Sequence, residues 1–156
     1  MRHYPPGALL LAMLLTACGN GVDTDRACTT MGCANGFVVN LQSDAWSAGA
    51  YQIAIVADDR TIVCTAALPL PKTGPQSACD AAGVTLGTSG SELEPTEQSL
   101  YEVRFSDTYP KTVTMTVSRD ATKLAEQSFT PEYATLQPNG PDCEPTCKYA
   151  SATLAW

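Results

Sequence analysis

Hydrophobic and polar positions alternate along most of the chain after residue 36. The alternation is clearest at residues 101–106, where Tyr101, Val103 and Phe105 are separated by polar side chains. Successive side chains of a β-strand point to opposite faces of the sheet, so this spacing predicts a strand with one buried face. The same pattern predicts about eight strands, at residues 37–42, 51–56, 61–66, 84–86, 101–106, 112–118, 123–130 and 149–156.

Turn-forming residues separate these predicted strands. Asp58-Asp59-Arg60 predicts a hairpin, and the segment 95–100 is the only helical candidate, too short for more than a loop or a single turn. The pattern predicts an all-β fold, a single antiparallel β-sandwich, with a small barrel as the alternative. The segment 49–55 (Gly-Ala-Tyr-Gln-Ile-Ala-Ile) resembles the Gly-x-Tyr-x-Ile-x-Ile strand of immunoglobulin-like and transthyretin-like domains, which implies a sandwich of that type.

The N-terminus follows a different pattern. An apolar run from Ala8 to Leu15 follows the positively charged start, and it is far shorter than the roughly 20 residues that a transmembrane helix needs. The run ends in Leu15-Thr16-Ala17-Cys18, which resembles the lipobox of bacterial lipoproteins. This resemblance implies that the Cys18 sulfur carries a diacylglyceryl group and that the peptide is cleaved just before Cys18.

The lipobox also predicts how the chain is divided. We expect a signal peptide at residues 1–17, the lipidated cysteine and a flexible tether at residues 18–35, and the β-sandwich at residues 36–156. Two or three acyl chains hold a protein stably on a membrane. In enteric lipoproteins an Asp after the lipidated cysteine retains the protein in the inner membrane, so Gly19 implies passage to the outer membrane.

Charge and histidine content exclude several function classes. Cleavage before Cys18 removes Arg2, which leaves 8 basic and 16 acidic residues and a net charge of −8. Such a surface repels nucleic acid. The single histidine, His3, is lost with the signal, which excludes Ser-His-Asp and Cys-His catalysis and zinc sites built on His. Paired carboxylates remain as a possible hydrolytic site.

The cysteine count agrees with the lipobox. Of seven cysteines, Cys18 is assigned to lipid, and the even remainder predicts disulfides in an oxidising compartment. The six are Cys28, Cys33, Cys64, Cys79, Cys143 and Cys147. We favour sequential pairing, Cys28–Cys33, Cys64–Cys79 and Cys143–Cys147. The competing arrangement links the N-terminal pair to the C-terminal pair, and a tetrathiolate zinc site is a third alternative.

Two further features are candidates for recognition. The segment 138–142 (Pro-Asn-Gly-Pro-Asp) precedes the turn at residues 143–147, and a stapled loop of this kind either binds a partner or only leads into the last strand. Among the aromatic residues, Trp46, Tyr109 and Tyr133 lie in predicted loops and are the best candidates for exposure, whereas most others belong to apolar strand faces.

Together these patterns predict a lipid-anchored protein of the bacterial envelope, similar to small envelope lipoproteins. We expect it to act as a non-enzymatic interaction or structural module, without cofactor or bound metal. Its partners would be the membrane, through the lipid on Cys18, and an envelope protein or a glycan. The alternative function is binding of a small ligand, either carbohydrate or calcium, by acidic loops and exposed aromatic residues.

Overall fold

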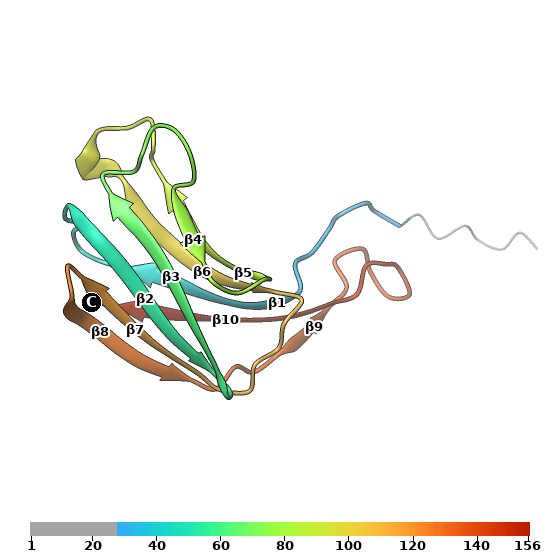
Figure 1. The fold of residues 1–156 in the computed structure, drawn as a ribbon. Helices are drawn as coiled ribbons and strands as arrows, with labels where there is room; N and C mark the ends of the chain where they lie inside the picture. The colour runs from blue at the N-terminus through green and yellow to red at the C-terminus, as the bar shows by residue number, and fades with distance from the viewer. Residues whose placement is uncertain (1–27) are drawn as a thin grey trace, which may run out of the picture.

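The computed structural model describes residues 28–156. The predicted signal peptide, the predicted lipidation site at Cys18 and the first part of the predicted tether lie outside the described residues. The described part is all-β, as predicted, and its ten strands form two sheets that face each other (Figure 1). A single 3-10 turn, η1 (Pro95–Glu97), lies where the sequence predicted a turn or loop. No helix within residues 28–156 is long and apolar enough to cross a membrane.

Each sheet contains five strands. Sheet A has the order β5-β6-β1-β10-β9, with bounds β5 (Val84–Ser89), β6 (Ser99–Ser106), β1 (Gly36–Gln42), β10 (Cys147–Ala155) and β9 (Ala134–Leu136). Sheet B has the order β4-β3-β2-β7-β8, with bounds β4 (Ser77–Cys79), β3 (Arg60–Leu68), β2 (Gly49–Ala57), β7 (Val113–Arg119) and β8 (Thr122–Phe129). All eight predicted strands are present, and the two that the sequence did not reveal, β4 and β9, are three residues long.

The sandwich is mostly antiparallel, with one exception that corrects the prediction. Strands β1 and β10 pair in parallel, with Gly36 opposite Tyr149 and Gln42 opposite Ala155. Both strands therefore start at one end of the sandwich and finish at the opposite end. Their common start is next to the N-terminal segment, and their common end is at the opposite side of the domain (Figure 1).

The core lies between the two sheets. In β2, Tyr51, Ile53 and Ile55 are buried, whereas Gln52 and Val56 point outward. The alternation predicted from the sequence therefore identifies the side chains that face the core. Each large apolar side chain buried in this way stabilises the fold by about 1.5–3 kcal/mol.

Aromatic contacts join the layers of this core. Phe37 of β1 stacks on Phe105 of β6, with ring centroids 5.9 Å apart. It also meets Phe129 of β8 edge to face, at 6.2 Å. Because β8 belongs to sheet B and β1 to sheet A, this second contact ties the two sheets together.

A β-bulge overturns one of the predicted side-chain orientations. Tyr101 was expected to face inward with Val103 and Phe105, but it is 47% exposed, and Leu100 is buried instead. The register between β5 and β6 shifts at Gly87 and Thr88, which leaves Tyr101 as the extra residue. The Tyr101 ring packs on Gly87. A Cβ at this position would lie 2.6 Å from the ring, so a residue with a side chain would clash with Tyr101.

Two of the three predicted disulfide pairs are wrong. Cys64–Cys79 joins β3 to β4 as expected, but the other bonds are Cys28–Cys143 and Cys33–Cys147. The parallel pairing of β1 with β10 explains this difference. It sets Gly36 beside Tyr149, so the cysteines just before these two residues meet, with Cα atoms 6.0 Å apart. The structure therefore has the competing arrangement, in which the N-terminal pair is linked to the C-terminal pair.

Hydrogen bonds reinforce this long-range connection. The buried side chain of Asn139 accepts a bond from the Met31 backbone N–H, 2.9 Å, and donates to the Met31 carbonyl oxygen, also 2.9 Å. It also donates to the Glu144 carbonyl oxygen, at 2.6 Å. The described residues of the predicted tether are thus fixed to the loop before β10 by two disulfides and by Asn139. We call this end of the sandwich the stapled end.

Candidate functional site

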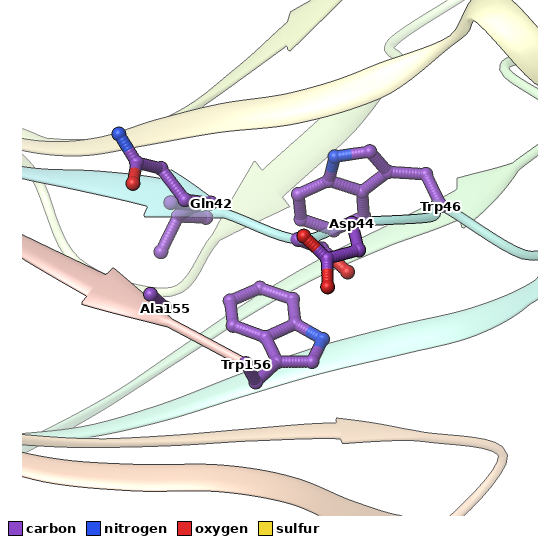
Figure 2. A pocket seen from close by; sticks show the side chains of 7 residues that line it. Gln42, Asp44, Trp46, Ala155 and Trp156 are labelled. Carbon is purple, nitrogen blue, oxygen red and sulfur yellow. The ribbon is translucent and has the colours of Figure 1, made fainter.

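A surface hollow lies at the end of the sandwich opposite the stapled end. It has a volume of about 690 Å³ and is lined by residues 41–44, Trp46, Ala155 and Trp156. We call it the Trp pocket (Figure 2). Its residues come from the end of β1, the loop between β1 and β2, and the end of β10, which the parallel pairing places side by side.

Two tryptophans form the apolar part of this pocket. The indole rings of Trp46 and Trp156 meet edge to face, with centroids 5.1 Å apart and an angle of 86° between their planes. Behind them, Trp46 packs on Tyr51 with centroids 5.5 Å apart. Tyr51 is only 2% exposed, and its hydroxyl donates to the Ser47 carbonyl oxygen at 2.8 Å, which holds the loop that carries Trp46.

Backbone and side-chain bonds position the remaining parts of the pocket. The Trp156 N–H donates to the Gln42 carbonyl oxygen at 3.1 Å, which extends the β1–β10 ladder to the last residue. The Ser43 hydroxyl donates to the Ala45 carbonyl oxygen at 3.0 Å and so closes the turn after β1. Edge-to-face packing is a favoured geometry for aromatic pairs, so the two indoles are held in place before any ligand arrives.

The polar part of the Trp pocket is open to solvent. Gln42 and Asp44 are exposed, and within residues 28–156 neither the Asp44 carboxylate nor the Gln42 side-chain amide has a hydrogen-bond partner. In the view of Figure 2 the carboxylate group of Asp44 falls between the two indole rings. These groups supply acceptors and a donor at the rim of an aromatic surface.

A second hollow shares part of its lining with the Trp pocket. It has a volume of about 400 Å³, and its lining includes Asp44, Trp46, Pro69 and Pro95. Trp46 and Asp44 thus line both hollows. The loop at residues 43–48 therefore contributes to two depressions at this end of the domain.

Another aromatic cluster lies toward the stapled end. Tyr109 and Tyr133 meet edge to face at 5.5 Å, and the Lys148 Nζ atom lies 5.2 and 5.3 Å from their ring centroids. The Tyr133 hydroxyl donates to the Pro110 carbonyl oxygen at 2.8 Å. Burial, with a smaller contribution from the Asp58 carboxylate, raises the pKa of Tyr133 to about 12. The interactions of this cluster are internal, and they fix the loops that precede β7 and β9.

Several acidic side chains accept hydrogen bonds from backbone N–H groups. Asp58 accepts bonds from the backbone N–H groups of Lys111 and Thr112 at 2.9 and 3.0 Å. Asp80 accepts one from Val63, and Asp120 accepts one from Ala50. Within the part of the chain that the structure describes, no three of the His, Cys, Asp and Glu residues lie together as a metal site would require.

The predicted loop residues are divided between the two ends of the sandwich. Trp46 contributes to the Trp pocket, whereas Tyr109, which is 39% exposed, and Tyr133 belong to the cluster near the stapled end. The segment 138–142 lies in the loop that the disulfides attach to the N-terminal segment. Nothing in the sequence pattern selects Asp44, and the alternation assigns Trp156 to an apolar strand face. Comparisons with protein-family models, curated proteins and solved structures find no match to this chain.

Proposed function

We propose that this chain is a lipid-anchored, non-enzymatic interaction module of the bacterial envelope, held to the membrane, and sorted to the outer membrane, through lipid on Cys18. One observation carries this proposal. The six cysteines after Cys18 are all used in three disulfides. Cys18 is therefore the cysteine left for lipid, in the position where the lipobox requires it. Disulfides also favour an exported protein over a cytosolic one.

The fold supports an attachment at the end of the module that lies away from the Trp pocket. Both long-range disulfides lie at the end of β1 and β10 that is nearer in sequence to Cys18, and the Trp pocket lies at the other end. Seven paired residues at about 3.3 Å each separate the two ends by roughly 20 Å. An anchor at Cys18 would thus be joined to the end of the domain that lies away from the Trp pocket, which leaves the pocket accessible to a partner.

The sandwich type belongs to the same proposal. We place the domain among immunoglobulin-like or transthyretin-like sandwiches, on the basis of the segment 49–55. In the structure this segment forms most of β2, the central strand of sheet B. Such sandwiches provide rigid scaffolds whose end loops are free to recognise other molecules.

The anchor is tested by substituting Cys18→Ala in the full chain and fractionating the cells. We expect the wild-type protein in the membrane fraction and the variant outside it. Thr24→Ala, which changes a nearby polar residue and leaves the lipobox intact, serves as the control and should stay with the membrane. Membrane association of Cys18→Ala equal to that of the wild type would contradict the proposal.

Sorting is tested separately with Gly19→Asp. If the host follows the enteric rule, this substitution moves the lipidated protein from the outer to the inner membrane, which density-gradient separation of the two membranes detects. An unchanged distribution would remove the assignment to the outer membrane and leave the anchor itself intact.

A further inference from the structure

We propose that the Trp pocket binds a neutral glycan chain, with a pyranose ring against the indoles of Trp46 and Trp156 and its hydroxyl groups bonded to Asp44 and Gln42. This inference rests on the proposed interaction module and names the chemical class of its ligand. It selects carbohydrate from the small-ligand alternatives that the sequence left open.

The surface of a sugar ring matches the composition of this pocket. A pyranose has an apolar C–H face and a rim of hydroxyl groups. An indole has an electron-rich face, which attracts polarised C–H groups and buries apolar area. The pocket combines two indoles with exposed polar groups, as small-molecule sites do when a few polar atoms fix the orientation of a ligand.

The polar rim is suited to hydroxyl groups in particular. The Asp44 carboxylate has two oxygens that accept hydrogen bonds, so it can take the protons of two neighbouring hydroxyls. The Gln42 amide both donates and accepts. Because neither group has a partner within the described residues, a ligand does not have to break an existing bond to reach them.

Charge decides between neutral and anionic sugars. After cleavage before Cys18 the chain carries a net charge of −8, and the pocket itself contains an aspartate but no cationic side chain. Uronic acids and phosphorylated sugars would be repelled both by the whole protein and by Asp44. The ligand that fits is therefore uncharged.

The shape of the pocket argues against a quaternary ammonium group. Such cations are recognised by aromatic cages that surround the charge. Here the third ring, Tyr51, is 2% exposed and packs behind Trp46, so only the two indoles face the ligand, and they form a corner. Such a corner can hold a flat sugar ring, whereas it leaves most of a spherical ammonium group exposed.

The second hollow indicates a chain of several sugars. Because Trp46 and Asp44 line both depressions, a ligand long enough to occupy both would contact these two residues and the lining of each depression. We expect a tetrasaccharide to bind at least about tenfold more tightly than the matching monosaccharide, since the second hollow adds contacts without a second loss of translational freedom.

The chain contains a built-in reporter for this test. It has two tryptophans, and both are in the pocket, so tryptophan fluorescence reports on this site alone. The full chain is purified from the cell fraction that holds it, in a detergent without a sugar or choline headgroup. It is titrated with neutral tetrasaccharides (chitotetraose, cellotetraose and maltotetraose), with polygalacturonate as the anionic probe and with choline as the ammonium probe.

We expect a saturable change in fluorescence with one of the neutral tetrasaccharides and none with the anionic probe or with choline. Asp44→Asn should weaken this binding about tenfold or more, because the amide group lacks one acceptor and the negative charge. Asp44 is exposed and has no partner among the described residues, so this variant keeps the fold. Tyr109→Ala removes an exposed aromatic residue elsewhere, and it should leave the affinity unchanged.

Three results would overturn the inference: no response to any neutral tetrasaccharide at millimolar concentration, a response to choline alone, or equal losses in Asp44→Asn and Tyr109→Ala. The outcome is independent of the anchor. Sugar binding by a chain that proves not to be lipidated would refute the anchoring proposal alone. A lipidated chain that binds no neutral glycan would refute this inference alone.

Discussion

The two disulfides at the stapled end should stabilise the domain in a strongly non-additive way. Cys28–Cys143 and Cys33–Cys147 each close a loop of more than a hundred residues, with sequence separations of 115 and 114. In the chain-entropy model, one such crosslink restricts the unfolded state by about 5 kcal/mol. Once the first bond exists, the second closes only a small ring, which consists of the segments 28–33 and 143–147.

The ring size sets the magnitude of the effect. It contains eleven residues, six from the first segment and five from the second, for which the same model gives about 2.5–3 kcal/mol. Removing either bond by a Cys→Ala pair should therefore cost about 2.5 kcal/mol. Removing both should cost about 7 kcal/mol, roughly 2 kcal/mol more than the sum of the two single losses. Cys64–Cys79, with a separation of 15, should cost about 3 kcal/mol and add independently to either.

Urea denaturation under non-reducing conditions measures these losses, with the slope of the transition reported for each variant because crosslinks change the unfolded state. If the variant that lacks both bonds is already unfolded without urea, its loss of unfolding free energy is at least the whole stability of the wild-type domain. Losses of about 5 kcal/mol for each single bond, or a combined loss equal to the sum, would refute the nested arrangement.

Three further changes test other parts of the structure. Gly36→Ala should destabilise the domain by about 2–4 kcal/mol, because φ is +111° and the new Cβ would lie 1.8 Å from a backbone oxygen of β6. The control is Gly74→Ala, where φ is +83° but the new Cβ meets open space, and it should cost only about 1–2 kcal/mol. Thermal melts compare the two variants. Asp58→Ala should cost about 0.5–1.5 kcal/mol, because it removes the acceptor of two exposed backbone N–H groups that water can then solvate. Asp58→Asn, which keeps an acceptor, should cost less in the same melts. The Tyr133 phenol, with its pKa raised to about 12, should keep its proton well above about pH 10 in an ultraviolet titration, and Tyr133→Phe should remove this late step. Because an unfolded phenol ionises near about pH 10, stability should be level below that pH and fall as pH rises toward 12, and Tyr133→Phe should reduce this fall; an equal fall in the variant would contradict the assignment.

Local pattern predicted the strands well because burial on one face of a sheet imposes a period of two. Tyr51, Ile53 and Ile55 follow this rule and are buried. The rule fails at Tyr101, because a bulge adds one residue to β6. On the N-terminal side of the bulge, the residues that face the core are therefore shifted by one position. Strands β4 and β9 escaped prediction because three residues are too few to show an alternation.

Long-range features depend on register, which the alternation does not encode. The disulfide partners follow from the parallel pairing of β1 with β10, and each lies more than a hundred residues away in the chain. The same pairing brings Trp156 beside Trp46 and so creates the pocket. The sequence identified Trp46 as a loop residue, but only the fold shows what it faces. Period-two patterning fixes which face is buried and leaves the order of the strands open.

Intact-mass spectrometry of the native protein tests the central claim most directly. The protein is taken from its own membranes, denatured without reduction and treated with a thiol alkylating reagent. The predicted mass is that of residues 18–156, less the six hydrogens lost to three disulfides, plus a diacylglyceryl group and any acyl chain on the new amino group, with no alkyl group added. An uncleaved chain, an alkylated Cys18 or additional alkylated cysteines would contradict the account.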